Sequence, residues 1–175
     1  NWKLLNDKPF GIVTLPDPEY LVQKRAERDL RIEEYKIMLE KLAIPCVDVV
    51  VENSEGEILM IKRSNEPAKG QWWLPGGRIF KKETIKDAAI RKIREEVGLE
   101  LTEVIVVGAY ETIFDKGPFG IESGTHSVNV LVKGSIKSFD NMKTNGDHSD
   151  VKFFRDVDES WHSYLKEAIA DARKK

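Results

Sequence analysis

Cysteine, long apolar runs and an excess of either charge are all scarce in this chain. Cys46 is the only cysteine among 175 residues, so no disulfide can form within the chain, and the surrounding valines favour a buried, reduced thiol. No apolar run is long enough to predict a membrane span, and no signal peptide is evident. The formal net charge of −2 gives no general attraction to nucleic acids or anionic membranes. We therefore expect a cytoplasmic protein that binds neither nucleic acid nor membrane.

Length and composition are ordinary for a globular protein. Charged residues make up 33% and hydrophobic residues 41% of the chain, and neither an internal repeat nor a low-complexity tract interrupts it. A chain of this length can bury a sizeable core as one domain with an appendage. We predict an N-terminal extension over residues 1–44 and one domain over residues 45–175.

The predicted extension carries one long helix. Asp17 followed by Pro18 is a typical helix start, because aspartate can cap the helix and proline fits its first position. Helix-favouring residues continue from Glu19 to about Leu42, and Pro45 ends the pattern. This helix could pack on the domain or pair with a second copy in a homodimer, and both alternatives stay open.

Strands surround one helix in the rest of the chain. We expect a hairpin of Cys46–Glu52 and Glu57–Arg63, strands at Thr102–Phe114, Thr125–Gly134 and Val151–Arg155, a closing helix over Asp158–Ala172, and a short strand at Gly11–Leu15 in the extension. The polar segment Ser138–Asp150 is too long for a tight turn, and it predicts a mobile loop. This order of elements predicts an α+β sandwich.

The stretch Gly77–Leu99 predicts an amphipathic helix with well-marked ends. It follows a glycine-rich turn at Pro75-Gly76-Gly77. Thr84 is a typical N-cap with Asp87 three residues later, and Gly98 suits a left-handed C-cap. Apolar residues recur at every fourth position and predict the buried stripe: Ile85, Ala89, Ile93 and Val97.

Charged side chains cluster on another face of the same helix. They lie within reach of one another, since residues three and four apart are neighbours on a helix, and they are Arg91, Lys92, Glu95 and Glu96. Two adjacent carboxylates beside a glycine turn, whose backbone a ligand can approach, favour a hard-cation site next to a phosphate.

The spacing of these residues resembles the Nudix hydrolase box, G-x5-E-x7-R-E-U-x-E-E-x-G-U, where U is aliphatic. The matching positions are Gly77, Glu83, Arg91, Ile93, Glu95, Glu96, Gly98 and Leu99. Lys92 stands where the family has a glutamate that ligates metal or acts as a base, and a charged lysine can do neither. The resemblance covers about Val47 to Leu165 and implies the α+β Nudix fold, an α/β/α sandwich with a mixed sheet.

Two arginines and one aspartate outside the helix are further candidates for ligand binding. Arg63 and Arg78 flank the glycine turn, and guanidinium groups bind diphosphate oxygens with paired hydrogen bonds; a solvated surface role is the alternative. Asp48 interrupts an apolar strand, so it either has a specific partner or faces a cleft, unless it lies exposed at an edge.

The aromatic and histidine candidates each have two interpretations. Trp72 and Trp73 are either core residues or a wall on which a base or sugar stacks. His126 lies on an otherwise apolar strand face, so a structural role is as well supported as a catalytic one. His148 lies among carboxylates that help it hold a proton, and it is a candidate base near neutral pH; a surface histidine without a role is the alternative.

Within the Nudix family the chain looks most like the GDP-mannose mannosyl hydrolase branch. Two segments carry this similarity: the hairpin from Asp48 through Glu52-Asn53-Ser54-x-Gly56-Glu57, and Arg63-x-Asn65-x-Pro67-Ala68-x-Gly70-x-Trp72 leading to Pro75-Gly76-Gly77-Arg78. The branch also lacks the glutamate that Lys92 replaces here, and it carries a catalytic histidine in a late polar loop, which matches His148.

This resemblance implies a Mg2+-dependent attack of water on the anomeric carbon of GDP-mannose or a related GDP-hexose, which releases GDP and free sugar. His148 would take the proton of the water, and Arg63 and Arg78 would offset charge on the departing diphosphate. The expected ligands of Mg2+, or of Mn2+ in its place, are Gly76, Glu95, Glu96 and Asp147. The remaining expected substrate contacts are Asp48, Arg91, Trp72 and His126.

Two other functions stay open at this point. The first is a nucleoside-diphosphate-sugar or ADP-ribose-type pyrophosphatase, with metals held by Glu95, Glu96 and either Asp147 or Glu111. The second is a Nudix domain that binds a nucleotide without hydrolysing it, because Lys92 has removed a key carboxylate.

Overall fold

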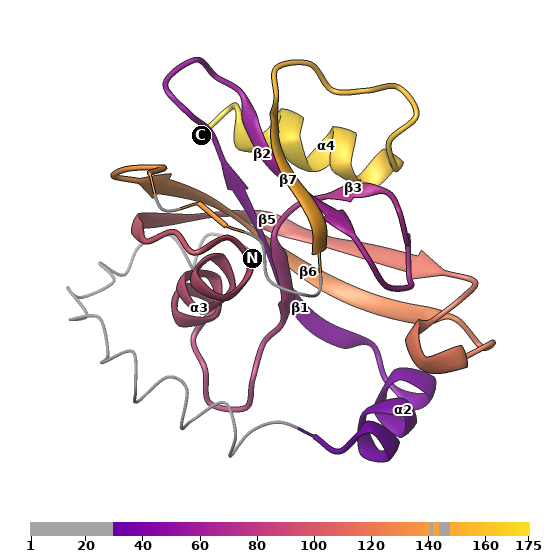
Figure 1. The fold of residues 1–175 in the computed structure, drawn as a ribbon. Coiled ribbons are helices and arrows are strands. Elements are labelled where there is room, and N and C mark those ends of the chain that lie inside the picture. Colours follow the sequence, from indigo (N-terminus) through magenta and orange to yellow (C-terminus); the bar gives the residue numbers. More distant parts are fainter. Residues whose placement is uncertain (1–29, 141, 144–147) are drawn as a thin grey trace.

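The computed structural model describes residues 30–140, 142–143 and 148–175 (Figure 1). Its elements in chain order are α2 (Ile32–Lys41), β1 (Ile44–Val51), β2 (Ile58–Arg63), β3 (Trp72–Trp73), β4 (Gly76–Arg78), α3 (Ile85–Val97), β5 (Leu101–Phe114), the short 3-10 helix η2 (Pro118–Gly120), β6 (Thr125–Ile136), β7 (His148–Phe154) and α4 (Ser163–Ala172). Within this part of the chain, no helix is long and apolar enough to cross a membrane.

The strands form two sheets. One has the order β4-β1-β6-β5 and the other the order β3-β2-β7. The strands β1 and β6 run parallel, whereas the other pairs are antiparallel. The register of β1 with β4 sets Asp48 opposite Gly76. This mixed arrangement confirms the predicted α+β fold with a mixed sheet.

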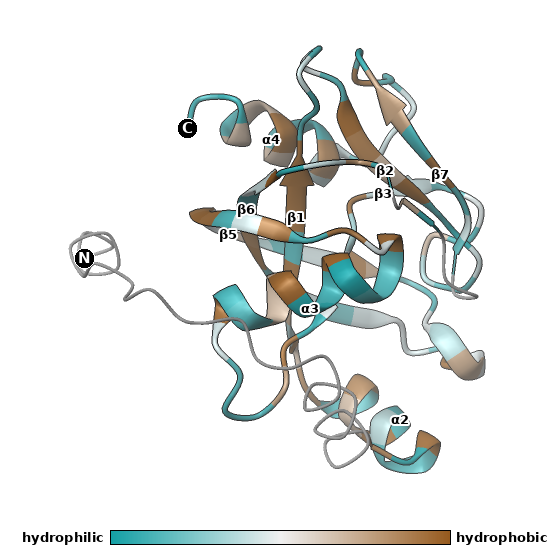
Figure 2. Cartoon of the chain, turned by 60° about the vertical axis from the view of Figure 1, so that its left-hand side comes forward, coloured by the Kyte–Doolittle hydropathy of each residue, from teal (hydrophilic) through white to brown (hydrophobic). Residues whose placement is uncertain are grey.

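Helices cover both faces of the strands. Val47, Val49 and Val51 of β1 pack in the core that α3 covers, while Val50, on the other face, packs with Leu165 and its neighbours on α4. Figure 1 shows α3 and α4 on opposite sides of the strands, and in Figure 2 much of β1 and β2 carries the hydrophobic colour. Strands that are buried on both faces need continuous apolar runs, which explains why β1 lacks a polar alternation.

The ends of α3 lie close to their predicted positions. The hydroxyl of Thr84 accepts a 3.1 Å hydrogen bond from the backbone N–H of Asp87, and Gly98 adopts the left-handed conformation with φ 69° and ψ 18°. Ala89, Ile93 and Val97 of the predicted stripe are fully buried. The capping pattern therefore predicted α3 correctly from local sequence.

The predicted hairpin of β1 and β2 is wrong as an element of one sheet. The turn exists, with the N–H of Gly56 donating to the carbonyl of Asn53 over 3.0 Å. However, β1 and β2 belong to different sheets, and only a bridge between Glu52 and Ile58 joins them at the turn. The reason is competition for the edges of β1, which are occupied by β4 and β6.

Two segments predicted as irregular are strands. Gly76 and Gly77, expected in a turn, form β4 together with Arg78 and pair with β1. His148, expected in a mobile loop, begins β7 and pairs with Arg63 at the end of β2. Both segments gain their backbone hydrogen bonds from distant strands, and their own composition carries no sign of this.

The helices at the two ends of the described region are shorter than predicted. The helix α2 begins at Ile32, because Arg31 is extended and forms a capping box with Glu34. The predicted helical residues 19–29 and the strand at residues 11–15 lie outside the described part of the chain. The helix α4 begins at Ser163, where Nδ1 of His162 accepts a hydrogen bond from the N–H of Tyr164.

Candidate active site

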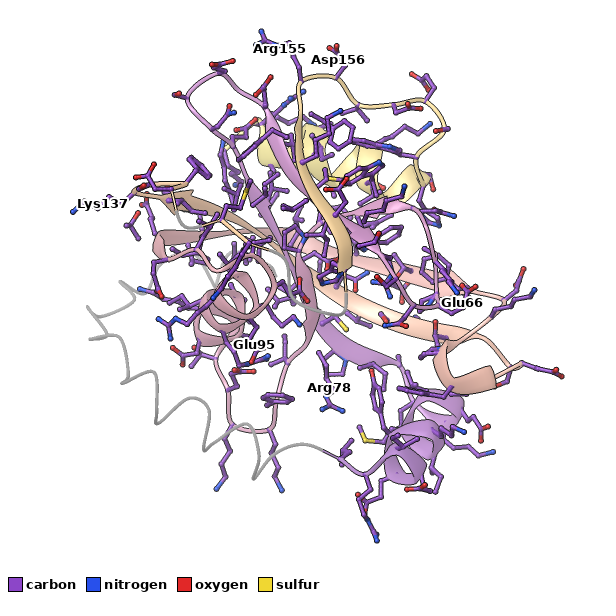
Figure 3. All side chains as sticks on the ribbon, in the orientation of Figure 1. Glu66, Arg78, Glu95, Lys137, Arg155 and Asp156 are labelled. Carbon is purple, nitrogen blue, oxygen red and sulfur yellow. The ribbon has the colours of Figure 1, made fainter. Side chains whose placement is uncertain are left out.

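A cavity of about 490 Å3 opens between α2, the edge of β1 and β4, and the C-terminal half of α3. Its walls come from segments far apart in the sequence, including Tyr35, Arg63, Glu66, Arg78 and His148. Figure 3 shows Glu95 and Arg78 on neighbouring elements at the centre of the molecule, with Glu66 on the loop after β2.

Asp48 forms part of the cavity floor and is 5% exposed. Its Oδ2 accepts a 2.6 Å hydrogen bond from the hydroxyl of Tyr164 on α4. Burial raises the pKa of Asp48 to about 6, and the hydrogen bond from Tyr164 opposes that shift. The predicted specific partner of this carboxylate is therefore Tyr164, and a carboxylate with this pKa can accept hydrogen bonds from a ligand near neutral pH.

Gly76 lies directly against Asp48. A Cβ at Gly76 would be 2.3 Å from Oδ1 of Asp48 and 2.3 Å from the carbonyl oxygen of Val47. No side chain fits there, so glycine is required by space and not by its backbone angles. The lack of a side chain at Gly76 lets β4 lie close to β1 at the floor of the cavity.

The floor also contains polar residues that the sequence analysis missed. Asn129 on β6 donates a 3.0 Å hydrogen bond from Nδ2 to Oγ1 of Thr112 on β5, and both are buried. Alternation places Ser127 and Asn129 on one face of β6, which was the available signal. Cys46 completes this lining, and burial raises its pKa to about 12, so it is a thiol and not a reactive thiolate.

Glu96 lies at the junction of α3, β4 and β7. Its Oε2 accepts a 2.9 Å hydrogen bond from the N–H of Gly76, and its Oε1 lies 2.5 Å from Nζ of Lys92. Burial works against the charged form of Glu96, but the Lys92 ammonium and His148 outweigh it and hold the pKa below its usual value. Glu96 is therefore a buried, ionised carboxylate.

The predicted metal position is occupied by the side chain of Lys92. Its Nζ lies 3.9 Å from Oε2 of Glu95 as well as 2.5 Å from Oε1 of Glu96, and its Cε would be 3.0 Å from a Cβ at Gly77. Among the described residues, no three metal-binding side chains converge on one point. Asp147, a further predicted ligand, lies outside the described residues. The donor set that is described does not fit a resident divalent ion, because Glu96 is already paired with the ammonium of Lys92 and Glu95 with the guanidinium of Arg91.

Arg91 holds the loop before α3 in place. Its Nε and Nη2 donate to the two carboxylate oxygens of Glu83 over 2.7 and 2.8 Å, and Nη1 reaches Glu95 over 3.2 Å. Nη2 also donates to the carbonyl of Arg78, and the guanidinium stacks 4.1 Å from the ring of Phe80. Arg91 lines the cavity, but this set of bonds shows a structural role.

His148 points at Glu96 from β7. Its Nε2 lies 3.5 Å from Oε1 of Glu96, and its side chain is only 8% exposed. Neither ring nitrogen has a hydrogen-bond partner among the described residues. A buried imidazole without partners, beside a carboxylate and in a cavity, can accept a proton from a ligand or a bound water.

Arg63 and Arg78, which were predicted to clamp a diphosphate, both line the cavity. The Nε of Arg63 donates a 2.6 Å hydrogen bond to the carbonyl of Pro67, and burial lowers the pKa of this guanidinium. The guanidinium of Arg78 stacks 4.6 Å from the ring of Tyr35 and 5.1 Å from that of Phe80. The two arginines enter the cavity from different elements, one at the end of β2 and one at the end of β4.

Two predicted substrate contacts lie away from the cavity lining. Trp72 packs edge-on against Phe154, with ring centroids 4.8 Å apart, whereas the buried Trp73 lines the cavity. His126 lies beside Glu111, with 3.4 Å between Nε2 and Oε1. Neither Trp72 nor His126 is among the lining residues, so the structure does not bring them together with the other candidates.

The chain is similar to known proteins of one family. The profile of the NUDIX domain matches residues 43–173. The Low-salt glycan biosynthesis protein Agl8 of Haloferax volcanii is 33% identical over 135 residues, which are 77% of this chain and 85% of that protein. The ADP-ribose pyrophosphatase of Methanocaldococcus jannaschii is 33% identical over 117 residues, which are 67% of this chain and 66% of that protein.

A solved structure supports the same fold. The MutT NUDIX hydrolase from Burkholderia pseudomallei superposes with a TM-score of 0.64 at 22% identity, covering 75% of this chain and 98% of that one. The predicted family is confirmed, whereas the GDP-mannose branch within it stays a prediction. Because the domain profile spans most of the chain, including the helix α3 and most of the residues that line the cavity, this protein belongs to the NUDIX domain family.

Proposed function

We propose that this protein hydrolyses a nucleotide sugar, with GDP-mannose or a related GDP-hexose as the favoured substrate. The reaction would release GDP and the free sugar by attack of water on the anomeric carbon. One observation carries the proposal: His148 is a buried imidazole without a hydrogen-bond partner in the described part of the chain, set beside Glu96 in a cavity that two arginines also line. This arrangement supplies a base and an anion-binding wall in one cavity.

The chemistry follows from the positions of these groups. The neutral imidazole of His148 would accept a proton from water as its oxygen bonds to C1 of the sugar, and the bond between C1 and the diphosphate oxygen would break. Arg63 and Arg78 would stabilise the charge that develops on the departing diphosphate. Glu96, held by the N–H of Gly76, would favour the protonated imidazole that forms.

A relative supports the choice of a nucleotide sugar. The Haloferax protein is named for glycan biosynthesis, and its match covers most of both chains. Glycan assembly consumes activated sugars, so a hydrolase of a nucleotide sugar is consistent with that name. Nudix hydrolases generally use divalent metal ions such as Mg2+, but Lys92 occupies the position where the sequence predicted the ion, so no step above runs through a metal.

A second candidate is a pyrophosphatase that cleaves the diphosphate itself. The similarity to the ADP-ribose pyrophosphatase of Methanocaldococcus favours it, as does the presence of Glu95 beside Glu96 at the cavity wall. In this reaction water attacks phosphorus, and the products are a nucleoside monophosphate and a sugar phosphate. The third alternative, binding without hydrolysis, predicts that neither set of products forms.

One experiment separates these functions. The protein is incubated in water enriched in oxygen-18 with a panel of GDP- and ADP-linked sugars, with and without Mg2+ or Mn2+. The products are separated by charge, and mass spectrometry shows which product carries the label. We expect GDP and a free hexose that carries the label. If the label is on a phosphate and a nucleoside monophosphate is released, the result contradicts the proposal and favours the pyrophosphatase. If no product forms, the result favours binding without hydrolysis.

A further inference from the structure

We propose that Lys92 is a built-in cation of this site: its ammonium takes the place of a resident divalent ion and meets the diphosphate of the ligand directly. The first part concerns the free protein and is independent of any reaction. The second part, the contact with a diphosphate, rests on the proposed function. The inference goes beyond that function because it names the residue that replaces the ion.

The geometry around Lys92 is that of a cation between ligands. The Nζ of Lys92 lies 2.5 Å from Oε1 of Glu96 and 3.9 Å from Oε2 of Glu95, the preceding residue of the helix. The side chain reaches there because Gly77 has no Cβ in its path, since a Cβ at that position would be 3.0 Å from Cε of Lys92. The carboxylate of Glu96 is anchored from the other side by the N–H of Gly76, so it cannot swing away to make room.

Among the described residues, the charged side chains that line the cavity balance. The cationic side chains are Arg63, Arg78, Arg91 and Lys92, and the acidic ones are Asp48, Glu66, Glu95 and Glu96. A glutamate in place of Lys92, as in the family box, would change the balance by two units. One divalent ion carries the same two charges, so Lys92 by itself supplies the compensation that the box glutamate leaves to a metal.

The ammonium also retains bonding capacity. It has three N–H donors, and the two neighbouring carboxylates Glu95 and Glu96 use at most two of them. Lys92 is partly exposed, with 17% of its side chain accessible, and lines the cavity. As far as the described residues go, a third donor is therefore available for an anionic ligand, and Arg63 and Arg78 line the same cavity.

Binding of Mn2+ alone tests the first part. Mn2+ is titrated into the nucleotide-free protein, and free Mn2+ is followed by electron paramagnetic resonance. We expect the wild-type chain to show no site tighter than on the order of 1 mM. Lys92→Glu should create a site that binds on the order of a hundredfold tighter, because a repelling charge next to the ion becomes an attracting one. Lys92→Gln should fall between the two.

Lys81→Glu is the matched control. Lys81 is exposed in the turn before α3 and is not part of the cavity lining, so this variant has the same change in net charge and should bind Mn2+ as weakly as the wild type. A wild-type site in the micromolar range that Glu96→Gln removes overturns the inference without any need for a Lys92 variant. Equal affinities of wild type and a folded Lys92→Glu overturn it as well.

Binding of GDP and ADP in the presence of EDTA tests the second part by calorimetry. We expect the wild type to bind at least one of them without metal, and Lys92→Gln to weaken this binding about tenfold through loss of a charge-assisted hydrogen bond. No binding by the wild type, or equal affinities for both proteins, overturns the contact. Failure of the proposed function looks different, since labelled products can be absent while the Mn2+ and nucleotide affinities follow the expected order.

Discussion

The hydroxyl of Tyr164 donates a 2.6 Å hydrogen bond to Oδ2 of Asp48, and it thereby ties α4 to β1 at the floor of the cavity. Both groups are buried. Burial and, after it, the charge of Asp48 raise the pKa of Tyr164 well above its usual value, so its hydroxyl keeps its proton and stays a donor. The pair is 116 residues apart in sequence and joins the two halves of the domain.

Asp48→Asn should change how stability depends on pH. The folded pKa of about 6 lies above the ordinary 3.8, so the ionised carboxylate destabilises the native state at pH values above about 6, and this cost disappears as the pH falls below about 4. The full cost is on the order of 3 kcal/mol. Asparagine accepts the bond from Tyr164 without a charge, so the variant should lose this pH dependence.

Urea unfolding of the wild type and Asp48→Asn at pH 8 and pH 5 measures the effect. We expect the free energy of unfolding of the variant, relative to the wild type, to be higher at pH 8 than at pH 5. Tyr164→Phe is the complementary variant: because it removes a hydrogen bond that favours the carboxylate, the pH-dependent range should move upward. Parallel pH profiles for the wild type and Asp48→Asn would show that Asp48 does not titrate as described.

Glu83→Gln should destabilise the protein by about 3 kcal/mol, because it removes the two short charged bonds of the buried guanidinium of Arg91 and leaves it only the longer contact with Glu95. The side chains of Arg91 and Glu83 are only 5% and 4% exposed, and two bonds of 2.7 and 2.8 Å join them. The readout is the midpoint and slope of urea unfolding.

Glu100→Gln is a control with the same bond geometry at the surface. Glu100 accepts bonds of 2.6 and 2.7 Å from Arg94, but its side chain is 53% exposed. An exposed pair contributes less than about 1 kcal/mol. Equal losses for Glu83→Gln and Glu100→Gln would mean that burial of the Arg91 pair does not matter for stability.

Gly76→Ala should destabilise the protein by on the order of 3 kcal/mol and weaken ligand binding, because the new methyl group would displace Asp48 or part β4 from β1. A Cβ at Gly76 would be 2.3 Å from Oδ1 of Asp48 and 2.3 Å from the carbonyl oxygen of Val47, which leaves no room for a methyl group. Gly70→Ala is the comparison: a Cβ there meets nothing within 4 Å, and only the left-handed φ of 79° opposes it, so a loss near 1 kcal/mol is expected. A Gly76→Ala protein as stable as Gly70→Ala would contradict the close packing of β4 on β1.

The sequence predicted most reliably what depends on neighbouring residues. The caps of α3 at Thr84 and Gly98 and its apolar stripe are local features, and the structure reproduces them. The spacing of Arg91, Glu95 and Glu96 likewise follows from one helix. The family follows from the same stretch, because a pattern of this length is specific.

Contacts between distant segments could not be predicted in the same way. The partner of Asp48 comes from α4, and the strand of His148 forms only because β2 offers an edge. The polar pair of Thr112 and Asn129 gave a weak signal, since single polar residues in strands are usually exposed. Trp72 was expected to contact the substrate, but its ring packs against Phe154. Nothing in the sequence indicated this contact with a distant strand.

His148→Gln should slow hydrolysis of the substrate about 100-fold or more if the imidazole is the general base, with a smaller change in KM. Glutamine keeps the size and polarity of the side chain but cannot accept the proton of the attacking water. The measurement is the steady-state release of the nucleoside diphosphate and free sugar.

His126→Gln is the matched control for this change. His126 lies beside Glu111 and away from the cavity lining, so its replacement should leave kcat within about twofold of the wild type, as expected for a residue without a role in proton transfer. Unfolding midpoints of both variants show whether either change disturbs the fold. A His148→Gln enzyme that is folded and as fast as His126→Gln excludes His148 as the base, and the proton would then have to leave through another group in the cavity.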